Sequence, residues 1–152
     1  MGNQVSTIRK CKNIRDRIYD RNQLPGSIFK REVLKLLSPE STIIDIGCGR
    51  KAEFVHWVAP YVRKAYGIDL EISEPIIYDN VHIMRGDAEE IPFPTHSVDV
   101  VTMVDVVEHL RNPKRVFLEC KRVLRLGGGA GRYDALQVSS SYLTRPCNPL
   151  LS

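Results

Sequence analysis

The sequence predicts an α/β fold, a three-layer Rossmann-like parallel sheet with helices on both faces. Short β-branched segments alternate with segments whose apolar residues recur at helical spacing, and this alternation is typical of parallel sheets. Residues 98 to 104 are almost entirely apolar, as expected of a strand that is covered on both faces. Glycine-containing turns follow two of the predicted strands, where open sheets of this kind bind ligands.

The order of the elements follows from apolar spacing and from glycine and proline breaks. Leu24-Pro25-Gly26 separates two N-terminal helices, Ser27 is a candidate cap for the second, and Ser38-Pro39 ends it. Residues 127 to 129 are glycines that stop the last helix. The predicted helices span residues 8–21, 27–37, 54–62 and 113–125, and the predicted strands span residues 42–46, 65–69, 81–84 and 98–104.

A chain of 152 residues suits one folded domain with a short extension at each end. Residues 1–26 are expected to be a helical extension, residues 27–129 the ligand-binding core, and residues 130–152 an atypical, poorly ordered tail. The tail has no clean apolar run, and only residues 133 to 138 suit a weak strand. We therefore expect a sheet that lacks its usual late strands, with an exposed edge that favours self-association. The sequence does not determine the oligomeric state.

Composition excludes several classes of function. The formal net charge is +4, and the basic residues before Pro25 are typical of a solvated helix face, so no nucleic-acid partner is expected. The four cysteines form no C-x-x-C pair and no disulfide framework, which predicts no metal site and a reducing, cytoplasmic location. No apolar stretch approaches the roughly 20 residues that span a bilayer, so stable membrane insertion is not expected. Residues 1–6 match a short myristoylation pattern, which leaves acylation of Gly2 open.

The first predicted strand runs directly into Gly47-Cys48-Gly49, where a helix is expected to begin. Glycine tolerates unusual backbone angles and lets a ligand lie against the main chain. The helix start beyond the turn offers N–H groups without helical partners. The turn is therefore the natural ligand site of this sheet, although many tight turns without a ligand have the same sequence pattern.

Acidic residues follow the next two strands. Asp69 lies about twenty residues beyond the glycine turn, where a carboxylate can accept both hydroxyls of a ribose. Asp87, after Gly86, can accept a hydrogen bond from an exocyclic amine, while a neighbouring backbone N–H serves a ring nitrogen. A helix cap at Asp69 and an ordinary surface turn at Asp87 are the alternatives. Three such elements at successive strand ends favour a shared nucleotide-binding crevice.

The ordered set of motifs resembles class I S-adenosylmethionine-dependent methyltransferases over residues 42 to 129. Residues 43–49 resemble the first motif of that family, and residues 66–69 resemble its acidic second-strand end. Residues 86–93 resemble the adenine-side segment of the type 11 branch, which includes the ubiquinone and menaquinone C-methyltransferases. The segments that complete the pattern are residues 97–101, 107–113 and 122–129.

The resemblance implies S-adenosylmethionine as the cofactor and methyl transfer to a small-molecule acceptor as the activity. It implies that Asp45 orients the loop and approaches the methionine amine, and that the methionine part crosses the backbone of residues 47–49. The remaining implied contacts are Asp69 with the ribose, Leu70 with the adenine face, Asp87 and Ala88 with the adenine edge, and Val104 and Asp105 with the floor near the sulfonium.

Methyl transfer from a sulfonium is an in-line displacement, so the protein needs no nucleophile of its own. An acceptor hydroxyl or acidic carbon is helped by a base, and His109 is the best-placed candidate because it follows the fourth predicted strand. The alternative is that His109 packs locally at a helix start. The acceptor itself cannot be identified from the sequence.

Two departures from the family pattern leave alternatives open. Lys51 stands where many members have a third glycine, so its side chain either crowds the site or projects outward. The tail does not resemble the family's late strands, so we expect a truncated chain or a replaced end, and a non-catalytic methyltransferase fold is an alternative. An NAD-dependent oxidoreductase is another alternative, because residues 47–52 satisfy G-x-G-x-x-A. Asp45 disfavours it, since that position is usually apolar in dinucleotide-binding folds.

Overall fold

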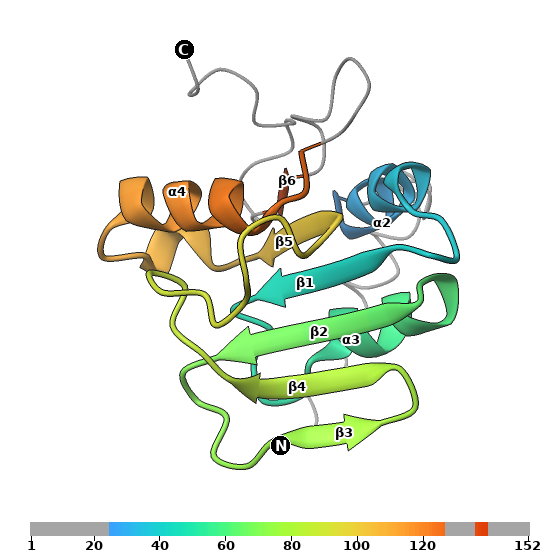
Figure 1. Cartoon of the computed structure of the whole chain (residues 1–152), viewed down its shortest axis with the longest axis horizontal. Helices are drawn as coiled ribbons and strands as arrows, with labels where there is room; N and C mark the ends of the chain where they lie inside the picture. Colours follow the sequence, from blue (N-terminus) through green and yellow to red (C-terminus); the bar gives the residue numbers. More distant parts are fainter. Residues whose placement is uncertain (1–24, 127–135, 140–152) are drawn as a thin grey trace, which may run out of the picture.

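The computed structural model describes residues 25–126 and 136–139 and contains one six-stranded sheet (Figure 1). The strand order is β3-β4-β2-β1-β5-β6. All neighbouring strands are parallel except β3, which pairs antiparallel with β4. The strands are β1 (Thr42–Ile46), β2 (Lys64–Asp69), β3 (Ile76–Tyr78), β4 (Val81–Arg85), β5 (Val100–Val104) and β6 (Leu136–Ser139).

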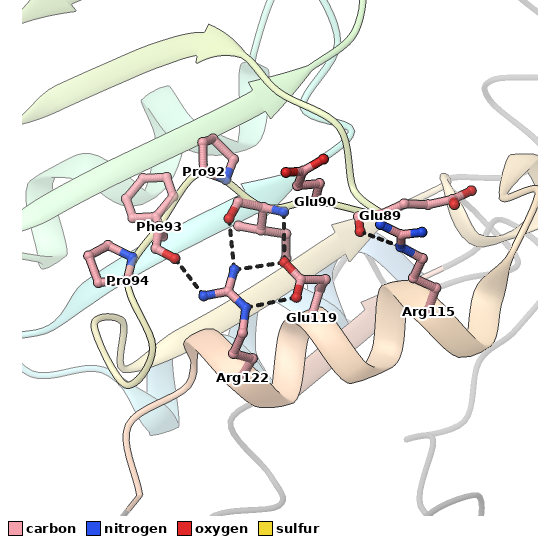
Figure 2. A pocket seen from close by; sticks show the side chains of 9 residues that line it. Glu89, Glu90, Pro92, Phe93, Pro94, Arg115, Glu119 and Arg122 are labelled. Carbon is pink, nitrogen blue, oxygen red and sulfur yellow. Dashed lines mark hydrogen bonds and ion pairs between the residues drawn. The ribbon is translucent and has the colours of Figure 1, made fainter.

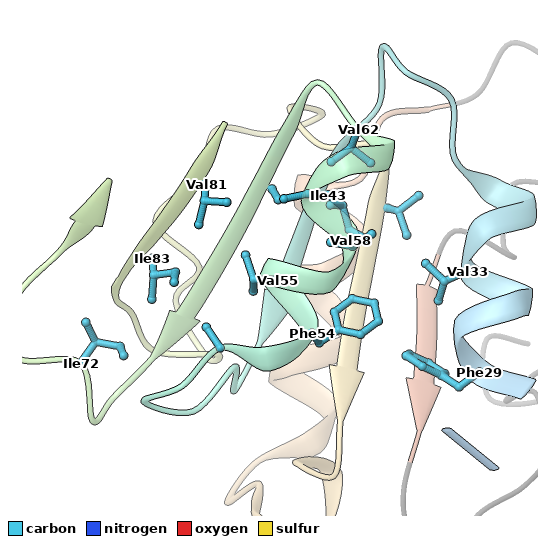
Figure 3. Close-up of a cluster of buried hydrophobic side chains, with 14 residues drawn as sticks. Phe29, Val33, Ile43, Phe54, Val55, Val58, Val62, Ile72, Val81 and Ile83 are labelled. Atoms are coloured by element: carbon cyan, nitrogen blue, oxygen red, sulfur yellow. The ribbon is translucent and has the colours of Figure 1, made fainter. Parts of the chain in front are cut away.

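Helices cover both faces of the sheet, which confirms the predicted α/β fold class. On one face, α2 (Pro25–Leu36) and α3 (Glu53–Val58) cover a buried apolar cluster, which Figure 3 shows. On the other face, α4 (Pro113–Val123) covers a second cluster. Successive residues of β1 alternate between the two clusters, Ile43 in the first and Ile44 in the second, because side chains alternate along a strand.

The predicted strands at the centre of the sheet are present, with small shifts at their ends. β1 spans residues 42–46 as predicted and is buried along its whole length. β5 begins at Val100 rather than at Val98, because Val98 forms an isolated bridge with Leu124 beyond α4. The Asp99 carboxylate then accepts hydrogen bonds from the Thr42 N–H at 2.8 Å and from Arg125 at 2.7 Å. Asp99 thus joins the start of β1 to the chain that leaves α4.

Two helices differ from their predicted bounds. α2 covers Pro25–Leu36, so it includes Pro25 and Gly26 in addition to residues 27–36 of the predicted helix. The predicted helix over residues 54–62 divides into α3 and a 3₁₀ turn, η2 (Ala59–Tyr61). Pro60 cannot donate the hydrogen bond that would continue α3.

β3, the three-residue strand that forms a hairpin with β4, was not predicted from the sequence. Its residues Ile76, Ile77 and Tyr78 are all exposed, so no buried alternation marks it. The turn to β4 passes through Asp79, whose φ of 48° lies in the left-handed region that aspartate tolerates better than most residues. β-branched and aromatic residues followed by Asp-Asn are the local signal for this hairpin.

β6 lies in the segment that the sequence assigned to an atypical tail. It pairs in parallel with β5, with Leu136 opposite Val101 and Val138 opposite Met103. One weak strand was predicted here, at residues 133–138. The helix predicted at residues 8–21, the glycines at residues 127–129 and the rest of the tail lie outside the described residues. Within the described part of the chain, no helix has the length and apolar character needed to cross a bilayer.

Candidate cofactor-binding site

The loop after β1 bends over the end of β2. The backbone N–H groups of Gly47 and Cys48 both donate to the carbonyl of Ile68, at 2.8 and 3.1 Å. Gly47 and Gly49 have φ values of +71° and +66°, which lie in the region that favours glycine. Ala52, also at positive φ, is the N-cap of α3. The predicted strand–turn–helix arrangement is therefore present at residues 42–58.

The two glycines have different surroundings. An added Cβ at Gly47 would lie 2.3 Å from Cγ2 of Val106, so the segment after β5 packs directly against this backbone. At Gly49, no heavy atom of the described residues lies within 4 Å of that position. Gly47 is therefore required for packing, whereas Gly49 leaves open space beside the main chain where a ligand can approach.

Asp69, at the end of β2, joins the glycine loop to the chain that follows it. Its Oδ2 accepts from the Gly49 N–H at 2.9 Å, and its Oδ1 accepts from the Glu71 N–H at 2.8 Å. A carboxylate has about four acceptor positions, so both oxygens retain capacity for ribose hydroxyls. Leu70 beside it is 49% exposed, an apolar surface next to a polar anchor. These two residues have the chemistry that an adenosine requires.

Asp45 lies behind the glycine loop and is only 3% exposed. Its Oδ1 accepts a hydrogen bond from the Thr102 hydroxyl of β5 at 2.7 Å. Burial raises the pKa of Asp45 to about 7, the Thr102 hydrogen bond opposes that rise, and the charge of Asp69 adds to it. Asp45 pairs with Gly67 of β2, two residues before Asp69, so the strand register brings these two predicted site residues near each other.

Cys48, between the glycines, is a neutral thiol. Burial raises its pKa to about 12, and the nearby charges of Asp45 and Asp69 act in the same direction. Its Sγ lies 2.9 Å from the position of a Cβ at Gly67, so only a glycine there lets the side chain pack against β2. A thiol with this pKa is not a nucleophile at neutral pH. The structure thus leaves Cys48 a backbone and packing role.

Asp87 and Ala88 follow β4 at the same edge of the sheet. The Gly86 N–H donates to the Asp69 carbonyl at 3.3 Å, which connects this turn to the end of β2. Asp87 is exposed, and its Oδ1 accepts from the Glu89 N–H at 2.8 Å. Ala88 packs against the cluster under α4. The turn geometry proposed as the alternative is therefore present, and it leaves the second carboxylate oxygen of Asp87 with acceptor capacity.

The segment after β5 carries the remaining predicted residues. Val104 is partly buried against the cluster under α3. Asp105 is exposed and has a φ of 54°. His109 ends η3 (Val107–His109), is exposed, and donates its backbone N–H to the carbonyl of Val106 at 2.9 Å. Local packing and a role as a base are both compatible with this placement.

The predicted residues come together at one edge because their strands are parallel neighbours. The turns after β1, β2, β4 and β5 all lie at the carboxyl ends of those strands. Backbone hydrogen bonds from Gly47 to Ile68 and from Gly86 to Asp69 link the first three turns, and Val106 links the fourth through its contact with Gly47. The arrangement provides carboxylates, exposed backbone and an apolar surface along a single edge.

A cavity of about 730 Å³ lies elsewhere, between residues 89–94 and α4 (Figure 2). None of the predicted site residues lines it. The Arg122 guanidinium donates to the carbonyls of Phe93 and Ile91 at 2.7 and 2.8 Å, and it pairs with Glu119 at 2.7 Å. Glu119 in turn accepts from the Ile91 N–H at 2.9 Å. These contacts attach the loop before β5 to α4, so we assign this region a structural role.

Comparison with known proteins identifies similar sequences. Residues 44–130 match the family model described as methyltransferase domain. The chain is 34% identical over 116 residues to a probable cobalt-precorrin-6B C(15)-methyltransferase (decarboxylating) of Archaeoglobus fulgidus, covering 66% of this chain and 70% of that protein. It is 48% identical over 50 residues to the chloroplastic 2-methyl-6-phytyl-1,4-hydroquinone methyltransferase 2 of Oryza sativa subsp. japonica, covering 33% of this chain and 14% of that protein.

A solved structure supports the fold. YcgJ from Bacillus subtilis superposes with a TM-score of 0.56 at 24% sequence identity, over 69% of this chain and 47% of that one. The chain therefore spans less than half the length of both the rice protein and the Bacillus protein. The family model, over residues 44–130, includes the glycine loop and the acidic residues at the ends of β2 and β4.

Proposed function

Because the chain belongs to the methyltransferase domain family, whose cofactor is S-adenosylmethionine, we propose that it transfers the cofactor's methyl group to a small-molecule acceptor. The supporting observation is the Asp69 carboxylate, which is fixed by two backbone N–H groups beside the open space at Gly49. Such a group is held in place before a ligand arrives, so little ordering is needed on binding.

Each side of the cofactor has a matching set of residues in this proposal. Asp69 accepts the ribose hydroxyls, Leu70 covers one face of the adenine, and the turn at Asp87 and Ala88 contacts its edge. The backbone of residues 47–49 supports the methionine part, with Asp45 behind it and with Val104 and Asp105 near the sulfonium. When bound, S-adenosylmethionine supplies an electrophilic methyl group on its sulfonium sulfur.

The residues of the chain then align the reacting groups and exclude water, and they take no covalent part in the reaction. Holding the two reacting atoms in line and excluding water accounts for much of the rate enhancement in a displacement of this kind. The neutral Cys48 thiol does not compete with the acceptor as a nucleophile. His109 is proposed as the base that removes an acceptor proton, since it is exposed at the same edge of the sheet.

The proposed acceptor is a hydroquinone. The 50-residue match to the rice hydroquinone methyltransferase, at 48% identity, supports this class. The resemblance of residues 86–93 to the adenine-side segment of the type 11 branch, which includes quinone methyltransferases, is compatible with this class. The buried Asp45 argues against the NAD alternative, because a dinucleotide fingerprint usually has an apolar residue at that position.

Label transfer tests this proposal. The chain is incubated with methyl-labelled S-adenosylmethionine and a prenylated hydroquinone, with a sterol and a cell extract as other acceptors. Label is expected in the extracted hydroquinone. Asp69→Asn should lower the cofactor affinity at least about tenfold, because charge-assisted hydrogen bonds to the ribose are weakened. Glu71→Gln is the matched control, since its exposed pair with Arg50 contributes little.

Methyl transfer, the acceptor class and the binding role of Asp69 are tested by separate outcomes. A wild-type chain that binds S-adenosylhomocysteine and labels none of the acceptors would exclude methyl transfer by this chain. Label in the extract without label in the hydroquinone would exclude the proposed acceptor class. Equal cofactor affinity of the wild type and Asp69→Asn would exclude the assigned binding role of Asp69.

A further inference from the structure

Thr102 is a buried polar residue that the sequence analysis did not assign to the site. It lies in β5 directly opposite Asp45 of β1, and the two side chains share the sheet face under α3. Thr102 is 0% exposed and Asp45 is 3% exposed. The Thr102 hydroxyl donates to the Asp45 Oδ1 at 2.7 Å, so the two side chains are hydrogen-bonded in a region shielded from water.

The Thr102 hydroxyl has one proton and two acceptors within reach. The Asp45 Oδ1 is at 2.7 Å, and the carbonyl oxygen of Ile44 is at 3.4 Å. With a charged Asp45, the hydroxyl donates a short, charge-assisted bond. With a neutral Asp45, the carboxyl can donate to the hydroxyl oxygen, and the hydroxyl proton then has only the long contact with Ile44. The local geometry therefore favours the charged carboxylate.

Other neighbours of Asp45 do not favour its charged form. On β2, Gly67 lies opposite Asp45 and has no side chain, and the nearby Asp69 carries a like charge. The Cys48 thiol of the glycine loop is neutral, and α3 contributes the apolar Val55 next to Gly67. Within residues 25–126 and 136–139, no salt bridge involves Asp45.

We propose that Thr102 is a positioning residue whose hydroxyl holds the Asp45 carboxyl behind the glycine loop and favours its charged form, and that cofactor binding depends on the ionisation of this buried carboxyl. This inference rests on the proposed function. S-adenosylmethionine carries a sulfonium and an ammonium group, and a charged carboxylate attracts both. Affinity therefore increases as Asp45 ionises, in the neutral range where its pKa lies.

Calorimetric titration with S-adenosylmethionine from pH 5.5 to 9 tests the inference. In the wild type, affinity is expected to rise with a midpoint near 7. Thr102→Val keeps the shape and removes the hydroxyl, so the midpoint should move upward by about one pH unit. Thr102→Ser restores the hydroxyl and should return the midpoint toward that of the wild type. The amine of the cofactor also titrates, but it does so equally in every variant.

A second measurement needs no ligand. The carboxyl carbon resonance of Asp45, followed by NMR over the same pH range, should titrate near 7 in the wild type and in Thr102→Ser. Titration near the ordinary value of 3.8 would overturn the inference. In the calorimetric titration, equal midpoints for the wild type and Thr102→Val would also overturn the inference and leave the proposed function intact. No cofactor binding by the wild type at any pH would overturn both.

Discussion

At the scale of single residues, Gly47 and Gly49 have similar positive φ angles but different surroundings. Both have φ near +70°, but only Gly47 faces the Val106 side chain. Gly47→Ala should lower the free energy of unfolding by about 3 kcal/mol, since it adds a steric clash to the left-handed strain. Gly49→Ala should lower it by only about 1 kcal/mol. Urea unfolding of the two variants measures the difference.

The cofactor affinity of the same two variants separates packing from binding. In Gly49→Ala, the added methyl group would occupy the open space beside the loop. The affinity of this variant for S-adenosylhomocysteine should therefore fall, although its loss of stability is small. A Gly49→Ala variant with wild-type affinity would contradict the placement of the ligand at this backbone.

The buried carboxyl of Asp45 predicts a conflict between stability and binding. Its pKa is raised in the folded state, from 3.8 to about 7, so its contribution to stability is present below pH 4 and is lost as the pH rises through 7. Asp45→Asn should therefore become more stable than the wild type with increasing pH, by up to about 4 kcal/mol at pH 8. Urea unfolding at pH 5 and pH 8 measures this, and a difference independent of pH would contradict it.

The sequence identified those site residues that depend on local pattern. Gly47 and Gly49 follow β1, which its β-branched residues mark as a strand, and Asp69 ends the strand that was predicted over residues 65–69. The sequence could not identify Thr102, because its contact with Asp45 depends on the register of two strands that are 57 residues apart. Val106 was not identified for the same reason. Such contacts are set by sheet pairing, which periodicity along one segment does not determine.

At the scale of elements, Arg122 attaches the loop at residues 91–94 to α4. Arg122→Met removes hydrogen bonds to two carbonyls and the partner of Glu119, so it should lower the free energy of unfolding by about 2 kcal/mol. Hydrogen exchange at residues 91–94 should increase as well. Lys121→Met, at an exposed position of the same helix, is the control and should change stability by less than about 0.5 kcal/mol.

The pH dependence of this contact has the opposite sign to that of Asp45. The hydrogen bond and charge of Arg122 lower the pKa of Glu119 below its ordinary value of 4.5. The stabilisation is therefore present above that pH and is lost as the pH falls through the lowered pKa. The difference between the wild type and Arg122→Met should decrease below pH 4.5. A difference that stays constant down to pH 3 would contradict the assigned ion pair.

The elements that the sequence predicted well are those buried on both faces. β1 matches its prediction at both ends, because a mostly β-branched segment bounded by turn residues leaves little ambiguity. β3 was missed because a three-residue exposed strand carries no pattern of burial. The end of α3 was misplaced because Pro60 shortens the helix, while the apolar spacing continues beyond it.

At the scale of the whole molecule, the sheet places the carboxyl ends of β1, β2, β4 and β5 along one edge and a separate apolar cluster under each helical layer. This separation keeps the site residues apart from most of the residues that stabilise the core. β6, with four residues, is the outermost strand described beside β5. The tail, residues 130–152, has the weakest apolar pattern in the sequence, and only one weak strand, at residues 133–138, was predicted in it.

A thermal melt with added ligand shows whether this edge of the sheet binds the adenosyl cofactor. A ligand that binds only the folded state raises the melting temperature. Millimolar S-adenosylhomocysteine should raise the Tm of the wild type, and it should raise the Tm of Asp69→Asn by a smaller amount. Millimolar NAD should leave the Tm of the wild type unchanged. An unchanged Tm with S-adenosylhomocysteine, or an equal rise with NAD, would contradict the account.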